Sequence, residues 1–124
     1  MLKSREKSIL ENIIIHCNRI DEILLNLTYE EFLKDNIKQD AICFQILQIG
    51  ELVKHFDNLF LSTYPNQPWA KIKGMRDIIA HGYGTIKKEE VWKVVSRDIG
   101  PLKKYCEQIL YKNLEEHRQV RRHY

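Results

Sequence analysis

The chain has 124 residues, the length of one ordinary domain. Its 44% hydrophobic and 30% charged residues are typical of a globular protein, and five Gly and three Pro are too few for the frequent turns of an all-β sandwich. The net charge of +3 permits contact with a polyanion without demanding it. Composition therefore favours a single helical domain.

Signals for export, membrane insertion and metal binding are missing from the sequence. The N-terminal MLKSREKS leads directly into a charged amphipathic pattern, and no apolar run approaches the roughly 18 residues of a membrane span. Cys17, Cys43 and Cys106 are widely spaced without a CxxC pair, which predicts buried thiols. His16 and His55 have no second ligand at helical spacing. We therefore expect a soluble cytoplasmic protein with no membrane segment, metal or other cofactor.

Four segments repeat apolar side chains at the three- and four-residue spacing of amphipathic helices. They cover residues 4–27, about 38–60, about 68–84 and about 88–113. Apolar positions include Ile9, Ile13, Cys17, Ile20, Phe44, Ile49, Val53, Leu59, Trp69, Ile72, Ile79, Val91, Val94, Leu102 and Cys106. Short connections between such helices predict an all-α, antiparallel four- to five-helix bundle in residues 1–113. Residues 114–124 are expected to form a polar, basic and frayed tail.

Local signals mark the ends and contacts of these helices. Thr28 and Glu31 have the spacing of a capping box, which predicts a short helix after them. Gly50, inside the second helix, costs about 1 kcal/mol relative to Ala, so we expect it to permit close packing of a neighbouring helix. Pro68 suits the first turn of the third helix, and Pro101 is expected to kink the last one.

The segment from Arg76 to Tyr83, RDIIAHGY, places a guanidinium, an imidazole and a phenol near one helix end. On an unbroken helix His81 lies about 140° around the axis from Arg76, so the two side chains do not share a stripe. They converge only if the helix breaks there. Gly82 and Gly84 are free to take positive φ at a helix end, and we expect them to provide that break.

These residue types suit the cleavage of RNA without a metal ion, which needs a base for the 2′-hydroxyl, an acid for the leaving 5′-oxygen and a fixed cation. His81 can serve as base or acid near neutral pH. Arg76 presents a planar, always charged fork to phosphate oxygens. Tyr83 can donate a hydrogen bond or stack on an unpaired base. Arg118 and His123 repeat the Arg-to-His spacing without the apolar helix, glycines or tyrosine, and we interpret that repeat as coincidence.

The arrangement of Arg76, His81 and Tyr83 resembles the Arg-x4-His-x-Tyr motif of HepT-like toxins, which belong to the HEPN superfamily of small helical domains. The supporting features are Ile49-Gly50-Glu51 in the second helix, Pro68-Trp69 at the start of the third, Gly74-Met75 before Arg76, and Val91-Trp92 at the start of the last. The likeness covers roughly residues 5–112 and implies a HEPN-like bundle.

The resemblance also implies a function: a metal-independent endoribonuclease toxin of a type VII toxin–antitoxin system. Such a toxin acts on RNA as a homodimer, with motif residues of two chains facing a shared cleft. Arg76 and His81 would be catalytic, and Asp77 would orient the site. Tyr83 would receive AMP from a cognate MntA-like nucleotidyltransferase antitoxin. The added charge and bulk would occupy the place of the RNA phosphate, a sufficient reason for silencing.

The same residues also have structural interpretations. His81 could donate to a helix-end carbonyl, Tyr83 could cover the end of the bundle, and Arg76 could form a surface ion pair with Asp77 or another acid. Glu51 suggests a hydrogen bond, within the chain or across a dimer. The alternative function is a non-catalytic HEPN-like subunit that binds a nucleotide or a nucleotidyltransferase. In that case His81→Ala alters the affinity for a partner, and neither the wild type nor the variant cleaves RNA.

Overall fold

The computed structural model describes residues 2–67 and 69–122 and, for 120–122, the backbone alone. Within these ranges the chain forms α-helices and one 3-10 turn with no strand, which confirms the predicted all-α class. The elements are α1 (Ser4–Leu24), α2 (Tyr29–Lys34), α3 (Asn36–Lys54), α4 (Asn58–Thr63), α5 (Trp69–Gly82), η1 (Tyr83–Thr85), α6 (Lys88–Arg97) and α7 (Ile99–Arg122). None of the helices in the described ranges combines the length and the hydropathy that a membrane span needs. The prediction for Pro68 concerns a residue outside them.

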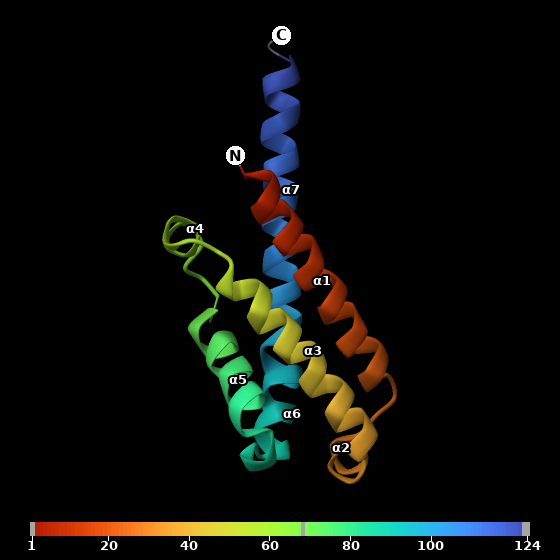
Figure 1. Ribbon diagram of the computed structural model, residues 1–124. Coiled ribbons are helices and arrows are strands. Elements are labelled where there is room, and N and C mark those ends of the chain that lie inside the picture. Colours follow the sequence, from red (N-terminus) through yellow and green to blue (C-terminus); the bar gives the residue numbers. More distant parts are fainter. Residues whose placement is uncertain (1, 68, 123–124) are drawn as a thin grey trace.

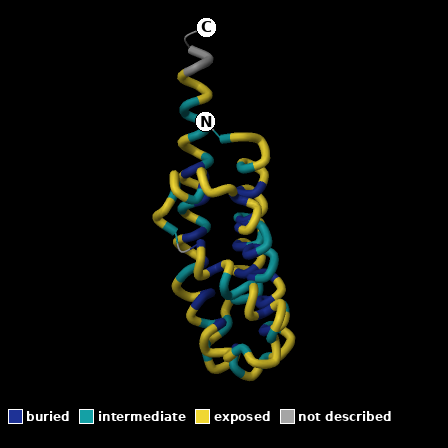
Figure 2. Tube along the Cα trace, turned by 60° about the vertical axis from the view of Figure 1, so that its left-hand side comes forward, coloured by how far each residue is buried: buried dark blue, intermediate teal, exposed yellow. Residues whose placement is uncertain are grey.

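The long helices pack as an antiparallel bundle, as predicted. Figure 1 shows α1 and α5 running toward one end of the bundle and α3 and α7 toward the other. The most extensive packing joins α3 to α5 and to α1. Buried residues line the inner sides of the helices (Figure 2). The core includes Leu10, Ile13, Cys17, Ile20, Phe32, Ile42, Ile46, Ile49, Val91, Leu102 and Cys106.

Two of the predicted long helices are each divided in two. The second ends at Lys54, and Asp57 begins the separate α4 by accepting a hydrogen bond from the Phe60 amide at 2.8 Å. The last predicted helix divides at Asp98 into α6 and α7. Pro101 therefore does not kink a continuous helix. It lies in the first turn of α7, where a missing N–H has no intrahelical acceptor to lose.

The capping box is confirmed. Thr28 Oγ1 accepts from the Glu31 amide at 3.2 Å, and Glu31 Oε1 accepts from the Thr28 amide at 3.0 Å. The hydrogen bonds from Thr28 lower the pKa of the Glu31 carboxyl below its ordinary value. Just before the cap, Asn26 has a φ of 60°, a left-handed conformation that asparagine tolerates and that turns the chain from α1 into α2.

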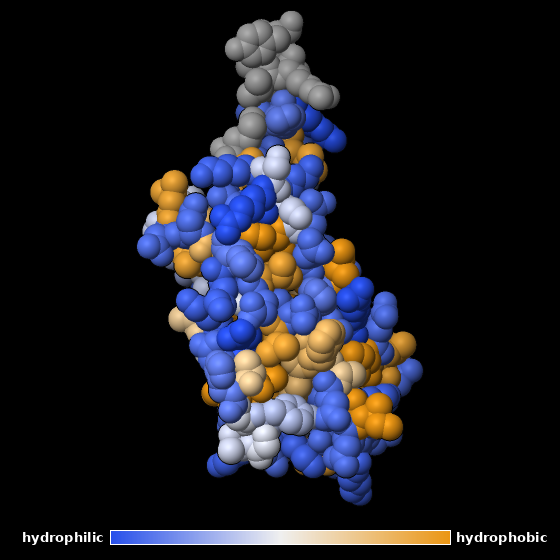
Figure 3. Space-filling model, in the orientation of Figure 1, coloured by the Kyte–Doolittle hydropathy of each residue, from blue (hydrophilic) through white to orange (hydrophobic). Residues whose placement is uncertain are grey.

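Some expected features of the surface and the tail are wrong. Phe44 and Leu59, predicted on buried faces, are 54% and 71% exposed, because the buried face of α3 is formed by other positions and Leu59 belongs to the separate α4. On the face of the bundle drawn in Figure 3, apolar patches lie among hydrophilic groups.

The expected frayed tail is instead a continuation of α7 through Arg122, which projects beyond the other helices (Figure 1). A domain boundary at residue 113 stays a prediction.

Gly50 brings α3 and α5 into close contact at Arg76, which confirms its predicted role. A Cβ atom at Gly50 would overlap the Cβ of Arg76 and lie 2.7 Å from its Cγ and 3.3 Å from the carbonyl oxygen of Ile72. Only the absence of a side chain permits this approach. The helix that carries the motif is therefore held directly against α3.

Candidate functional site

The candidate residues Arg76, Asp77 and His81 lie on α5, which is continuous from Trp69 to Gly82. No described glycine has a positive φ, so the predicted break by left-handed glycines is wrong. Gly82 has a φ of −153° and leads into η1, where the Thr85 hydroxyl donates to the Gly82 carbonyl at 2.7 Å. The helix ends at Gly82, one residue after His81. The imidazole therefore stays about 140° around the axis from Arg76.

Arg76 is held between two carboxylates at the seam between α3 and α5. Its Nη2 forms an ion pair with Glu51 Oε1, and its Nη1 donates to Asp77 Oδ1 at 3.0 Å. The side chain is 17% exposed, and its Nε has no hydrogen-bond partner among the described residues. The hydrogen bond to Asp77 raises the pKa of Arg76, with a smaller contribution from Glu51 and an opposing one from burial. The guanidinium is thus a charged and fixed group.

His81 lies in the last turn of α5 with an exposed side chain. Within the described part of the chain its imidazole has no hydrogen-bond or ion-pair partner, so the structural interpretation of a bond to a helix-end carbonyl is not supported. Ile78, on the same helix, is 50% exposed. An exposed imidazole without an intramolecular partner is available to a ligand.

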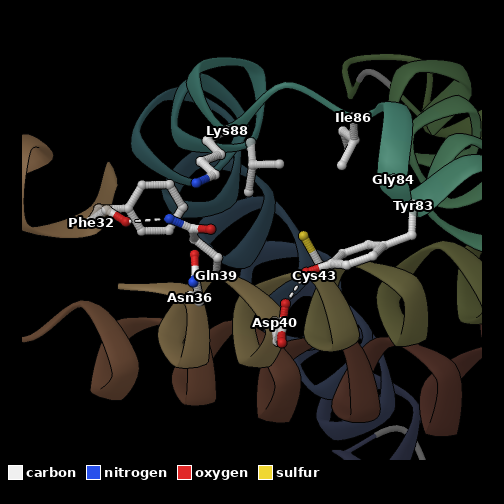
Figure 4. Close-up of a pocket in the computed structure, with 10 residues that line it drawn as sticks. Phe32, Asn36, Gln39, Asp40, Cys43, Tyr83, Gly84, Ile86 and Lys88 are labelled. Atoms are coloured by element: carbon white, nitrogen blue, oxygen red, sulfur yellow. Dashed lines mark hydrogen bonds between the residues drawn. The ribbon is translucent and has the colours of Figure 1, made fainter. Parts of the chain in front are cut away.

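Tyr83 turns away from Arg76 and toward the other end of α3. Its Oη donates a hydrogen bond to Asp40 Oδ1, and Figure 4 shows the ring reaching across to that carboxylate. This bond, followed by burial, raises the pKa of Tyr83 to about 12. The ring is 44% exposed, and the hydroxyl stays protonated at neutral pH. The three motif side chains therefore do not converge within one chain.

Sequence reasoning missed Asp40 and assigned Glu51 only a structural hydrogen bond. The two acids are eleven residues apart on α3, which is three turns plus about 20°, so they lie on one face. Because α5 runs antiparallel to α3, Arg76 meets Glu51 near one end of this face and Tyr83 meets Asp40 about 16 Å away. The spacing of the two acids was the signal that could have identified them.

No described group of three or more His, Cys, Asp or Glu side chains gathers in a way that could hold a metal ion. The three cysteines are free and buried, as predicted. Burial raises the pKa of the Cys43 thiol to about 11, so it is protonated and unreactive at neutral pH. The groups considered for chemistry along the described α3–α5 seam are therefore the carboxylates of Asp40, Glu51 and Asp77, the Arg76 guanidinium, the His81 imidazole and the Tyr83 phenol.

Comparison with known protein families gives a match over most of the chain. The family model described as "Ribonuclease HepT-like" matches residues 13–109. The chain belongs to the HepT-like ribonuclease family. A protein of Thermococcus cleftensis, named provisionally as ribonuclease HepT, is 33% identical over 102 residues, covering 82% of this chain and 93% of the relative. A Methanocaldococcus jannaschii protein, named provisionally as an RNase, is 31% identical over 107 residues, covering 86% and 98%. No solved structure matches at a significant level.

The HepT-like match includes the whole α3–α5 seam, from Asp40 and Glu51 to Tyr83, and ends before residues 114–124. The resemblance inferred from the motif is thus confirmed at the level of the family. The individual roles of Arg76, Asp77, His81 and Tyr83 stay predictions.

In this HepT-like chain, replacing Asp40 with asparagine is expected to lower the pKa of Tyr83 toward the ordinary value of about 10. The Asp40 carboxylate is the largest cause of the raised pKa, since it accepts from the neutral phenol and repels the phenolate. Ultraviolet titration of wild type, Asp40→Asn and Tyr83→Phe isolates this tyrosine by difference. A wild-type Tyr83 that ionises near pH 10 would contradict the hydrogen bond.

Proposed function

We propose that this HepT-like protein is an endoribonuclease toxin that cleaves RNA without a metal ion, with Arg76 and His81 as catalytic residues. The observation that carries the proposal is the guanidinium of Arg76, fixed between Glu51 and Asp77 within the region that matches the ribonuclease family. A preorganised cation stabilises developing negative charge without the cost of ordering a flexible side chain during the reaction. Asp77 is then a positioning residue for Arg76.

The reaction is an attack of the ribose 2′-oxygen on the adjacent phosphorus. His81 takes the 2′-hydroxyl proton as the new oxygen–phosphorus bond forms, and Arg76 compensates the charge on the phosphate oxygens. The bond to the 5′-oxygen breaks, and that oxygen leaves with a proton from a second acid. The products are a 2′,3′-cyclic phosphate and a free 5′-hydroxyl.

A symmetric homodimer would complete this site. Within one chain His81 and Arg76 are about 140° apart around the axis of α5. Their side chains therefore point in different directions and do not face one phosphate. A second copy placed against this part of α5 would let Arg76 of one copy and His81 of the other face one phosphate, and it would supply a second imidazole as the acid. The half-exposed Ile78, between the two residues in sequence, gives such an interface an apolar contact.

Regulation is proposed at Tyr83, through a type VII toxin–antitoxin pair in the cytoplasm, where RNA is available. A cognate MntA-like nucleotidyltransferase would join Tyr83 Oη to the α-phosphorus of ATP and release pyrophosphate. The hydroxyl proton would pass to Asp40, its hydrogen-bond acceptor, and then to water. The phosphodiester adds bulk and negative charge that RNA phosphates must approach, which opposes substrate binding.

The test incubates purified protein with single-stranded RNA in excess EDTA. The proposal expects cleavage products that end in a 2′,3′-cyclic phosphate, with the same rate with and without EDTA. Arg76→Lys keeps the charge but loses the planar fork, and we expect it to cut at least about tenfold more slowly. Intact RNA, with mass spectrometry showing an unmodified Tyr83, would instead favour the non-catalytic binding subunit.

A further inference from the structure

A half-open pocket of about 400 Å³ lies beside Tyr83, among α2, α3, η1 and the start of α6 (Figure 4). This volume falls in the roughly 300–1,000 Å³ range of sites for small molecules. Ile86 contributes accessible apolar surface, Phe32 and Val91 border the pocket from the buried core, and Asn36, Gln39 and Lys88 contribute polar groups. An apolar pocket with a few convergent polar groups is the usual form of a small-molecule site.

Gln39 provides an acceptor inside the pocket. The residue is only 6% exposed, and its Nε2 donates to the Phe32 carbonyl at 2.7 Å. Its Oε1 has no hydrogen-bond partner within the described part of the chain, and Figure 4 shows this oxygen turned into the space on the Tyr83 side. The Gln39 side chain is held in place by its buried amide nitrogen, so the oxygen that faces the pocket is a fixed acceptor for a ligand that donates a hydrogen bond.

Lys88 provides a cation at the same pocket. It is the first residue of α6, and its ammonium extends toward Phe32 and Gln39 (Figure 4). No described ion pair engages it, and the N-cap residue Lys87 makes no side-chain hydrogen bond to the helix start. A free ammonium beside uncapped helical amides favours a bound anion.

We propose that this pocket is a site for a nucleoside monophosphate, and that its occupant is the adenylate carried by Tyr83. The inference rests on the proposed modification of Tyr83. Tyr83 and Lys88 line opposite sides of the pocket, so a nucleotide bonded to the tyrosine oxygen can extend across it toward the Lys88 ammonium. A base with an exocyclic amino group, as adenine has, can donate to Gln39 Oε1. Apolar contact with Ile86 completes the site.

Modification also releases the contact that Tyr83 makes in the free protein. The hydroxyl proton donated to Asp40 is lost, and a phosphate takes its place beside that carboxylate. Like charges repel, so the phosphate moves from Asp40 toward Lys88. Because the nucleotide is tethered, its effective concentration is about millimolar or higher, and even a weak site is filled. The pocket thus fixes the nucleotide on the α3–α6 side of Tyr83.

The test titrates unmodified, nitrogen-15-labelled protein with 5′-AMP and follows amide shifts by NMR. We expect saturable shifts in residues 36–43 and 86–91, with a dissociation constant of about 1 mM because an untethered mononucleotide makes few contacts. Lys88→Met should weaken binding about tenfold by removing a charge-assisted contact. Lys87→Met, the matched control outside the pocket lining, should bind as wild type. Asp40→Asn should bind AMP more tightly, because it removes a like charge.

The other outcomes overturn the proposal. AMP that shifts no pocket amide at about 10 mM, far above the expected constant, shows that the pocket does not bind the nucleotide. If inorganic phosphate binds as tightly as AMP, the pocket recognises only an anion and not a nucleotide. If a 2′-O-methyl RNA oligonucleotide shifts the amides of the pocket residues and AMP does not, the pocket binds the RNA substrate and not the nucleotide. The proposed function has a separate test, because His81→Ala should lose RNA cleavage and still bind AMP.

Discussion

Replacing His81 with alanine is expected to reduce RNA cleavage at least about 100-fold, because a positioned general acid or base contributes about 10²–10⁴-fold to a rate. The imidazole is exposed and has no described partner, so its removal breaks no described contact. Surface changes of this kind usually alter the free energy of unfolding by no more than about 0.5 kcal/mol. Single-turnover cleavage of a single-stranded RNA, with melting followed by circular dichroism, measures both quantities.

His55→Ala is the matched control for that variant. His55 is also exposed and also ends a helix, at the C-cap of α3, but it lies outside the motif. We expect it to cut RNA at the wild-type rate. Unimpaired cleavage by His81→Ala would show that another group is the base. Cleavage by neither the wild type nor the variants would favour the non-catalytic subunit.

Replacing Gly50 with alanine is expected to lower the free energy of unfolding by about 1–3 kcal/mol, the usual range for overpacking. The added Cβ would overlap the Cβ of Arg76, and the carbonyl of Ile72 at 3.3 Å blocks an easy escape. Helices α3 and α5 must therefore separate. Because Arg76 is the residue displaced, we also expect slower RNA cleavage. Urea denaturation gives the change in stability, and the cleavage assay gives the change in rate.

Gly74→Ala is the control for the intrinsic helix preference of alanine. Gly74 lies inside α5, and a Cβ there would meet nothing within 4 Å. This substitution is expected to stabilise the protein by about 0.5–1 kcal/mol, since glycine loses more backbone entropy in a helix. Equal effects of the two substitutions would contradict the close approach of α3 and α5 at Gly50.

Sequence periodicity was sufficient for the helical class and for the main buried positions. Ile13, Cys17 and Ile20 lie on the buried side of α1 at the predicted spacing, and the capping box at Thr28 forms as predicted. These features depend on contacts within a few residues, so local spacing determines them. The division of the second and last helices was missed because Asp57 caps a new helix and Pro101 suits a helix start as well as a kink.

What the sequence by itself determined is therefore the helical class, the main buried positions, the family motif in residues 76–83 and the close contact at Gly50. Only the tertiary structure decided which partner each motif residue contacts. Arg76 forms an ion pair with Glu51, and Tyr83 donates a hydrogen bond to Asp40 at the far end of the same face of α3. Those pairs follow from the antiparallel register of α3 against α5, across more than twenty residues of sequence. Register is a property of packed surfaces, and no local spacing within α5 encodes it.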